Sequence, residues 1–374
     1  SGVDQEESIL VIFPDCKNKL HREILFLKET SEHIAVWEGE KLTKERATEL
    51  SGIKTIYWLD QFETIFRQLV IESESVYLNS NEHLRTSNSM ETREDRFVKK
   101  FISDFPIHPT LRVAPIMHQI RSVKDSIEIE IMKKACDITE RGFRRILSFI
   151  KPEVMEYEIE AELMHEFLSN RSKGFAYTPI IASGKSACVL HYIENNKTCK
   201  NGDIILMDFG AEYANYASDL TRCVPVNGKF TSRQKEVYNS VLRVKNEATK
   251  LLNPGVFLND YHKEVGKLME EELLKLNLIS SKDIQNQDSK WPAYKKYFMH
   301  GTSHYIGLDT HDVGSWTEPI EENMVFTVEP GIYIPEEGIG IRLEDDVVVQ
   351  KNSAPKNLME NIPIEAEEIE DLMN

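Results

Sequence analysis

Four acidic residues lie in two apolar segments whose patterns are typical of β-hairpins. In the first segment, Asp208 and Asp219 stand in apolar runs on either side of a polar turn. A turn centred between Tyr213 and Ala214 places Asp208 directly opposite Asp219. Opposed side chains on a hairpin have Cβ atoms about 4.5 to 5.5 Å apart, where two like charges destabilise the pair. The first hairpin therefore predicts that a positive group lies between these two carboxylates.

The second hairpin repeats the arrangement near the C-terminus. Glu329 ends one apolar run and Glu344 lies in the next, and a turn centred between Glu336 and Glu337 places them opposite each other. One such pair could be a surface feature, or could share a proton because a neighbouring like charge raises a carboxyl pKa. Two pairs on apolar strands favour a metal site, since two divalent ions neutralise four carboxylates that burial would otherwise penalise.

A histidine-rich segment supplies nitrogen donors for such a site. It carries His300, His304 and His311 between residues 299 and 314. His300 and His304 are four residues apart, as in the zinc-binding HExxH motif, but Gly301 occupies the place of the glutamate, which argues against a zincin. A lone histidine is more often a structural residue than a ligand. The carboxylate pairs favour a ligand role here, because imidazole combined with carboxylates suits divalent cations.

The elements that must position these residues form two domains by pattern. From Ile9 to about Pro115, strand-like and helix-like segments alternate, which indicates an α/β domain. We expect strands at residues 9–13, 34–37, 56–58 and 76–78, and helices at residues 43–50, 61–72 and 91–105. A proline-containing stretch closes this part, so we expect one domain over residues 1–120 and a second over residues 121–374.

The larger predicted domain alternates helices with β-rich blocks. One capping box, Asp125 with Glu128, starts its first helix, and another, Thr231 with Gln234, starts a later helix that stops near residue 253. The β-rich blocks follow the helices at residues 177–226 and 298–349. This order indicates an internal duplication of architecture and an α+β class. Each block contains one of the two acid pairs.

The composition argues against several classes of function. The 374 residues carry 45 basic and 62 acidic side chains, a net charge of -17 that repels nucleic-acid phosphates and anionic lipid surfaces. No apolar run approaches the roughly 18 residues that a membrane span needs, and the acidic N-terminus lacks a signal-peptide pattern. The five cysteines are widely spaced, with no CxxC pair. We therefore expect a cytoplasmic protein without nucleic-acid or membrane partners.

Six ordered motifs make the sequence similar to a known family. They are VLHY at 189–192 followed by EN, MDFGA at 207–211, SDLTR at 218–222, FMHG to HDVG at 298–314, TVEPG at 327–331 and GIRLEDD at 340–346. With these motifs the chain resembles the pita-bread metallopeptidases, most closely their aminopeptidase P branch. The resemblance is dense from about residue 120 onward. It implies a C-terminal pita-bread domain and a smaller N-terminal α/β domain of the creatinase type, shorter than in the aminopeptidase P members.

The resemblance also implies roles for individual residues. Five would bind two divalent ions, usually manganese, with zinc or cobalt as alternatives: Asp208, Asp219, His304, Glu329 and Glu344. In the family pattern Asp219 and Glu344 bridge the ions. Four more residues would complete the catalytic centre: His191, His300 and His311 at the substrate cleft, and Arg342 behind the ligands. A homo-oligomer, dimeric or larger, is expected from the same resemblance.

The expected activity is removal of an N-terminal residue that precedes proline. Two ions can generate a hydroxide that attacks the scissile carbonyl. His311 or His191 would stabilise the oxyanion, and Glu329 would carry the proton to the leaving nitrogen. Because the nitrogen of a proline residue has no N–H, the ring must be recognised by its shape. The alternatives are a prolidase, which takes dipeptides, a methionine aminopeptidase, a metal-independent creatinase and a non-catalytic binding protein of the same fold.

Overall fold

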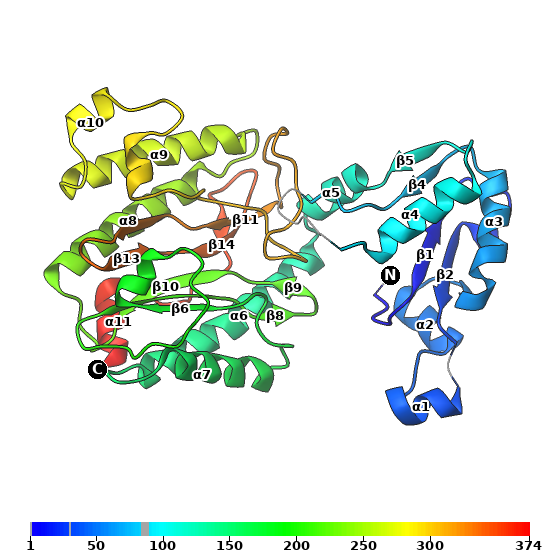
Figure 1. Cartoon of the computed structure of the whole chain (residues 1–374), viewed down its shortest axis with the longest axis horizontal. Coiled ribbons are helices and arrows are strands. Elements are labelled where there is room, and N and C mark those ends of the chain that lie inside the picture. The colour runs from blue at the N-terminus through cyan, green and yellow to red at the C-terminus, as the bar shows by residue number, and fades with distance from the viewer. Residues whose placement is uncertain (1, 30, 84–89) are drawn as a thin grey trace. The chain divides into compact units, whose positions relative to one another are not determined.

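The computed structural model describes residues 2–29, 31–83 and 90–374 (Figure 1). Packing divides the chain into two compact units, Ser1–Pro115 and Ile116–Asn374. Both units mix helices with strands, as expected for an α+β protein. All of the acids and histidines singled out above lie in the second unit.

The smaller unit is built around a three-stranded mixed sheet. Strands β1 (Ile9–Ile12) and β2 (Glu23–Leu27) are antiparallel, and β3 (Thr55–Trp58) is parallel to β2. A second, two-stranded parallel sheet joins β4 (Val76–Leu78) to β5 (Thr110–Arg112). The helices are α1 (Glu32–Glu38), α2 (Lys44–Ser51), α3 (Phe62–Glu72) and α4 (Arg93–Asp104), and α5 (Ala114–Ser122) spans the boundary between the units.

The central strand β2 organises the core of this unit. Its residues from Ile24 onward are buried on both faces, so alternate side chains enter two separate clusters. Ile24 and Phe26 pack with side chains of α3, whereas Leu25 and Leu27 pack with Ala47 of α2. A continuous apolar run of this kind is typical of a strand covered on both sides.

One predicted strand of this unit is wrong. Residues 34–37 belong to helix α1 rather than to a strand, and Val36 and Trp37 are exposed. The sheet already pairs β2 with β1 on one side and β3 on the other, so the chain following β2 has no neighbouring strand there. A short apolar run fits either structure, and the availability of a hydrogen-bonding neighbour decides between them.

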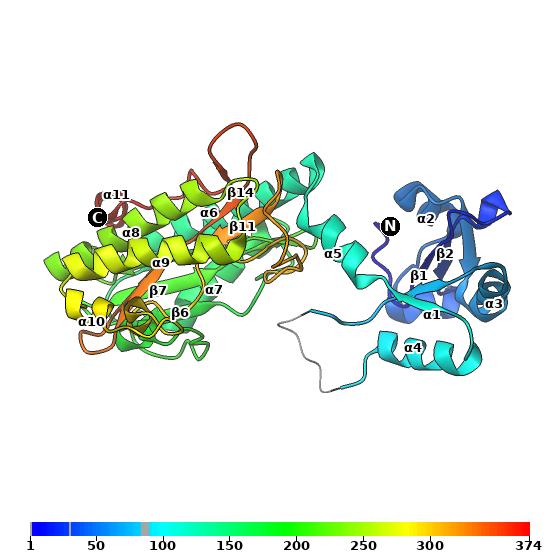
Figure 2. The same cartoon turned by 90° about the horizontal axis from the view of Figure 1, so that it is seen from above.

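In the larger unit, two pairs of helices enclose the strands. Helix α6 packs against α7 and α8 against α9. Figure 1 shows α8 and α9 above the strands and α6 and α7 below them, and Figure 2 shows α8 and α9 from above, lying over the strands. The helices are α6 (Ser126–Phe149), α7 (Glu156–Ser169), α8 (Ser232–Leu251), α9 (Leu258–Lys275), α10 (Ser281–Gln285) and α11 (Ala366–Met373).

The strands of the larger unit fall into the two predicted blocks, except for β15, which lies beyond the predicted end of the second block at residue 349. The first block holds β6 (Ile180–Ser183), β7 (Ile204–Phe209), β8 (Glu212–Tyr213), β9 (Tyr216–Ala217) and β10 (Leu220–Pro225). The second holds β11 (Val325–Val328), β12 (Gly331–Ile334), β13 (Ile339–Arg342) and β14 (Asp345–Val348), and β15 (Lys356–Asn357) follows it. Helices and strands thus alternate along the chain in the expected order.

Both predicted capping boxes are confirmed. Asp125 Oδ1 accepts a 2.8 Å hydrogen bond from the Glu128 N–H, and Glu128 accepts one from the Asp125 N–H. Thr231 and Gln234 form the same reciprocal pair at the start of α8. Each box satisfies two N–H groups that a helix start otherwise leaves without a partner. The two longest helices of the unit therefore begin where the sequence predicted.

The first hairpin has a different register from the predicted one. Its turn is centred between Ala214 and Asn215, which both have positive φ, as a two-residue hairpin turn of this kind requires. Asp208 consequently pairs with Thr221 and not with Asp219. The error moves the partner by two residues, which leaves Asp219 on the same face as Asp208 because side chains alternate with period two.

The predicted register of the second hairpin is confirmed. Gly331 pairs with Arg342 on one side of Glu329 and Glu344, and Val328 pairs with Asp345 on the other. At the two glutamates themselves the ladder is interrupted. The Glu329 N–H donates to the Thr302 carbonyl at 2.8 Å, and the Glu344 N–H donates to the Thr221 carbonyl at 3.1 Å. Both acids thus lie where their strands change partners and meet other segments.

Candidate metal centre

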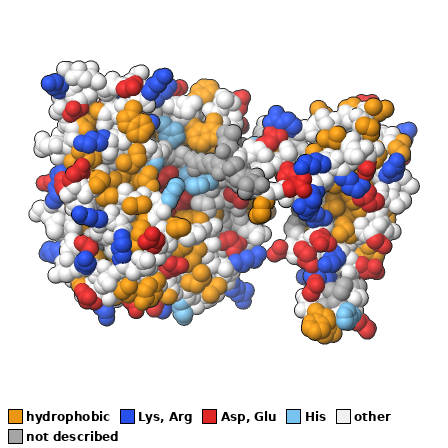
Figure 3. Space-filling view, viewed as in Figure 1, with side chains coloured by type: hydrophobic (Ala, Val, Ile, Leu, Met, Phe, Trp, Pro, Cys, Tyr) orange, Lys and Arg blue, Asp and Glu red, His pale blue; other side chains and the backbone are white. Residues whose placement is uncertain are grey.

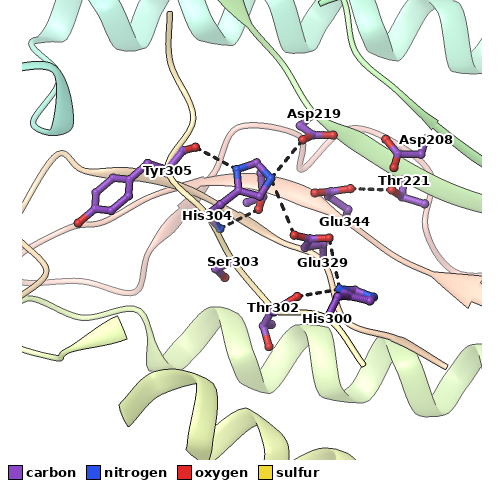
Figure 4. A network of polar contacts seen from close by, with 12 residues as sticks. Asp208, Asp219, Thr221, His300, Thr302, Ser303, His304, Tyr305, Glu329 and Glu344 are labelled. Atoms are coloured by element: carbon purple, nitrogen blue, oxygen red, sulfur yellow. Dashed lines mark hydrogen bonds and ion pairs between the residues drawn. The ribbon is translucent and has the colours of Figure 1, made fainter. Parts of the chain in front are cut away.

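The acids from both hairpins and one histidine converge inside the larger unit (Figure 4). Asp219, His304 and Glu344 are buried, and each offers a ligand atom within 4.8 Å of those of the other two. His304 Nε2 lies 3.5 Å from Asp219 Oδ2 and 3.8 Å from Glu329 Oε1. The side chain of Asp208 joins this group from β7.

Two further side chains hold Asp208 in place. The Tyr177 hydroxyl lies 2.5 Å from Asp208 Oδ1 and 2.5 Å from Asp219 Oδ1. Arg342, which is buried, pairs with the other carboxylate oxygen of Asp208. A single hydroxyl hydrogen can serve only one of two carboxylates at a time. The two aspartates therefore require either a further proton or a positive group between them.

Burial gives these carboxyl groups a strong preference for a proton or a cation. It is the largest cause that raises the pKa of Asp219 and of Glu344 well above their usual values, and the neighbouring acids add to it. Burial also raises the pKa of Glu329 to about 7, against the opposing effects of His304 and Arg342. Divalent cations would replace these protons and remove the repulsion.

The donor set fits divalent cations. Carboxylate oxygens and a neutral imidazole nitrogen are the ligands that such ions take in hydrolytic centres. His304 Nδ1 lies 2.9 Å from the Tyr305 carbonyl oxygen, so Nδ1 carries the proton and Nε2 faces the acids as a lone-pair donor. Asp208, Asp219, His304, Glu329 and Glu344 are thus brought together as possible ligands (Figure 4).

A layer of hydrogen bonds behind the acids ties the two hairpins to each other. Thr221 Oγ1 donates to Glu344 Oε2 at 2.6 Å and accepts from Arg342 Nε at 3.1 Å. Arg342 also donates from Nη1 to the Tyr333 hydroxyl oxygen at 2.9 Å. Outer contacts of this kind orient metal ligands. Arg342 therefore lies behind the acids and contacts both hairpins.

The remaining histidines lie around this group. His300 is half-buried, with Nδ1 3.6 Å from Glu329 Oε2, and burial followed by the charge of Arg342 lowers its pKa to about 3. The ring of exposed His311 stands at 84° to the His304 ring, with 4.5 Å between centroids. His191 is also exposed, and its charge adds slightly to the lowering of the pKa of His300. Figure 3 shows histidine side chains gathered over a hollow on this face.

Sequence reasoning missed three residues of this site: Tyr177, Thr221 and Tyr333. Thr221 could have been found from the correct register, because it lies directly opposite Asp208. Tyr177 is far from Asp208 and Asp219 in the sequence, and it reaches them only because β6 pairs with β7 beside it. No local pattern marks a contact of this kind.

The comparisons with known proteins identify the family. Residues 130–351 match metallopeptidase family M24, and residues 1–77 match the aminopeptidase P N-terminal domain. The chain belongs to metallopeptidase family M24. The chain is 33% identical in sequence to the Xaa-Pro aminopeptidase of Haemophilus influenzae. The alignment covers 100% of this chain and 86% of that protein. The predicted resemblance and fold class are confirmed, and the protein is a hydrolase that depends on divalent metal ions.

Solved structures agree with this assignment. The M24 chain matches aminopeptidase PepP of Pseudomonas aeruginosa with a TM-score of 0.88 and 30% identity, over 98% of this chain and 85% of that one. It matches zinc-substituted Escherichia coli aminopeptidase P in complex with product with a TM-score of 0.84 and 32% identity, over 94% and 82%. Among the described residues, no helix has the length and apolar character needed to cross a membrane.

Proposed function

We propose that this metallopeptidase removes the N-terminal residue from peptides that have proline in the second position. The observation that carries the proposal is the convergence of Asp219, His304 and Glu344 within 4.8 Å in a chain related over its whole length to Xaa-Pro aminopeptidases. Both parts are needed, because a fold alone does not determine a reaction.

Five residues would hold two ions: Asp208, Asp219, His304, Glu329 and Glu344. Asp219 and Glu344 are the most deeply buried of the four acids, so neutralisation by a bound cation would stabilise them most. When bound, two divalent ions supply a hydroxide at neutral pH and polarise the scissile carbonyl. Manganese is the proposed ion. Zinc and cobalt are the alternatives that the same donors accommodate.

Glu329 is the proposed carrier of the proton that the leaving nitrogen needs. It is the most exposed of the four acids, with 20% of its side chain accessible, so it can reach both the other ligands and a substrate. His300 Nδ1 lies 3.6 Å from Glu329 Oε2. The pKa of His300 is lowered to about 3, so this histidine stays neutral at physiological pH. A neutral imidazole can pass a hydrogen bond without adding a charge.

His311 and His191 are the proposed donors to the oxyanion. Both are exposed, and the His311 ring contacts the His304 ring at the edge of the acid cluster. A donor aimed at developing negative charge stabilises the transition state more than the substrate. Arg342 is proposed to hold Asp208 and, through Thr221, Glu344.

A comparison of three substrates tests the activity. The protein is treated with a chelator and then with manganese, and cleavage of Xaa-Pro-Yaa, Xaa-Pro and Met-Ala-Yaa peptides is measured. Metal-restored cleavage of Xaa-Pro-Yaa alone supports the proposal, whereas preference for the dipeptide would mean a prolidase. No metal-dependent cleavage of any peptide would favour a binding protein of the same fold.

A matched pair of variants tests the metal site itself. Asp219→Asn removes a proposed metal ligand, and Asp371→Asn makes the same change at an exposed position of α11. Asp219→Asn should bind manganese at least about 10-fold more weakly in calorimetry, and Asp371→Asn should bind it as the wild type does.

Light scattering tests the proposed homo-oligomer. The cytoplasmic location stays a prediction.

A further inference from the structure

The loop between Gly307 and Gly314 carries a buried acid, Asp312, that the proposed chemistry does not use. Its side chain is 1% exposed, and two cationic side chains approach it. Arg121, at the end of α5, donates to Asp312 Oδ1 at 2.5 Å, and Lys124 Nζ lies 3.5 Å from Oδ2. The Val313 N–H donates to Oδ1 at 2.8 Å. Asp312 is therefore tied to the segment that precedes α6.

The loop is shaped to receive this carboxylate. A Cβ atom at Gly307 would lie 2.4 Å from Asp312 Oδ2 and 2.9 Å from Lys124 Cε, closer than real side chains approach. At Gly314, a Cβ atom would lie 2.4 Å from the Tyr305 ring. Both glycines are thus required by close packing, and the loop has little freedom to move once Asp312 is in place.

The same loop shares a hydrogen-bond acceptor with the metal ligand His304. The Tyr305 carbonyl oxygen lies 2.9 Å from the Asp312 backbone nitrogen, which donates to it, and 2.9 Å from His304 Nδ1. One carbonyl group therefore orients the His304 ring and holds the peptide group that joins His311 to Asp312. The 4.5 Å contact between the His304 and His311 rings follows from this common reference point.

We propose that Asp312 is a positioning residue that holds His311 beside the metal centre, through its ion pairs with Arg121 and Lys124. This role rests on the proposed function, in which His311 is a hydrogen-bond donor to the oxyanion. Asp312 would be the residue that places this donor. A charged pair with low exposure is costly to disturb, since its members cannot regain full hydration. Loss of the Asp312 charge would free the loop and move His311, while His304 keeps its own bond to Tyr305.

A double-mutant cycle between Asp312 and His311 tests the proposal. Asp312→Asn should lower kcat about 10- to 100-fold with KM within about twofold, as for outer contacts of catalytic groups. In a His311→Ala background the same change should cost less than about threefold, because Asp312 acts through His311. Manganese affinity of Asp312→Asn, measured by calorimetry, should stay within about threefold of wild type.

Two further variants provide the controls. Asp309→Asn neutralises an exposed acid that accepts a 2.7 Å bond from the same Arg121, and it should leave kcat unchanged. Arg121→Gln removes one of the two ion pairs of Asp312 and should lower kcat about 3- to 10-fold. Because Arg121 is partly exposed, this variant tests the proposal even where Asp312→Asn does not fold.

Imidazole NMR provides a readout that does not depend on turnover. In protein labelled at histidine, the His311 resonances are assigned from their loss in His311→Ala, and they should shift in Asp312→Asn but not in Asp309→Asn. If the wild-type protein cleaves no Xaa-Pro-Yaa peptide, the proposed function fails. The shift of the His311 resonances then still shows whether Asp312 positions His311. Three results would each overturn the positioning role. The His311 resonances could stay unshifted in Asp312→Asn, or Asp312→Asn could lower kcat equally in the wild-type and His311→Ala backgrounds. The third is a manganese affinity weakened more than about 10-fold by Asp312→Asn.

Discussion

Asp208 lies directly opposite Thr221 across β7 and β10, and Thr221 Oγ1 donates to Glu344 Oε2 at 2.6 Å. One hydroxyl group thus connects the hairpin of the aspartates to that of the glutamates. The same oxygen accepts from Arg342 Nε, which pairs through its guanidinium with Asp208. Asp208 of the first hairpin and Glu344 of the second are therefore held by the same hydrogen-bonded layer.

Thr221→Val should weaken metal binding without unfolding the protein. The substitution keeps the shape but removes the donor to Glu344 and an acceptor of Arg342. We expect a manganese Kd about 10- to 100-fold higher in calorimetry, as for losses of outer contacts to metal ligands. Thr198→Val, whose hydroxyl contacts the Met155 thioether at 3.2 Å, is the control. Equal manganese affinities in the two variants would contradict the role of Thr221.

Tyr177→Phe should destabilise the metal-free protein more than the manganese-bound one. The Tyr177 hydroxyl is the hydrogen-bond donor that Asp208 and Asp219 share. Removal of this hydroxyl leaves a buried carboxylate without its donor. The free energy of unfolding in EDTA should fall by about 1 to 3 kcal/mol, measured with urea. Exposed Tyr157→Phe should change it little. A loss as large with manganese as with EDTA would show that the hydroxyl does not substitute for a cation.

The metal-free protein should lose stability as the pH rises. The pKa of Glu329 is raised from 4.5 to about 7 on folding, so the folded state holds a proton that the unfolded chain releases at lower pH. The resulting stabilisation is present below about pH 4.5 and disappears as the pH passes through about 7, with a loss on the order of 3 kcal/mol. Urea unfolding in EDTA at several pH values measures it. Saturating manganese should abolish this decline, and a rise in stability with pH in EDTA would contradict the prediction.

Glu329→Gln should give a folded protein with little turnover. The amide keeps the size of the side chain but cannot carry a proton to the leaving nitrogen, so kcat should fall at least about 100-fold. Circular dichroism and kcat on an Xaa-Pro-Yaa peptide are measured together. Glu322→Gln, an exposed change on the segment before β11, is the control. Activity near that of wild type would remove Glu329 from the mechanism.

Lys245→Met should destabilise the fold strongly. Lys245 of α8 and Arg222 both pair with Asp345, and all three side chains are almost fully buried. Removing one partner leaves the buried carboxylate less compensated, and we expect a loss of about 3 kcal/mol in the free energy of unfolding. Lys267→Met, which breaks an exposed pair with Glu264 in α9, should cost about 0.5 kcal/mol or less. Equal losses in urea unfolding would contradict the network's importance.

Two helix starts and the strand face that each acid occupies could be predicted from the sequence alone. Asp125 and Thr231 are visible as caps because a capping box uses residues only three apart. The register error at Asp208 did not change its face, because strand side chains alternate with period two. The acids, the histidines and the strand faces they occupy were therefore enough to predict a metal site, and the six ordered motifs pointed to the family.

The distant groups that support this site could not be predicted without the fold. The contacts of Tyr177 with Asp208 and of Thr221 with Glu344 join residues from separate segments. They exist because β6 pairs with β7 and because Thr221 of β10 meets Glu344 of the second hairpin. Residues 34–37 became helical for a related reason, since a strand needs a neighbour with free backbone groups. Local propensity and spacing act within a few residues, whereas these outcomes depend on which backbones lie side by side.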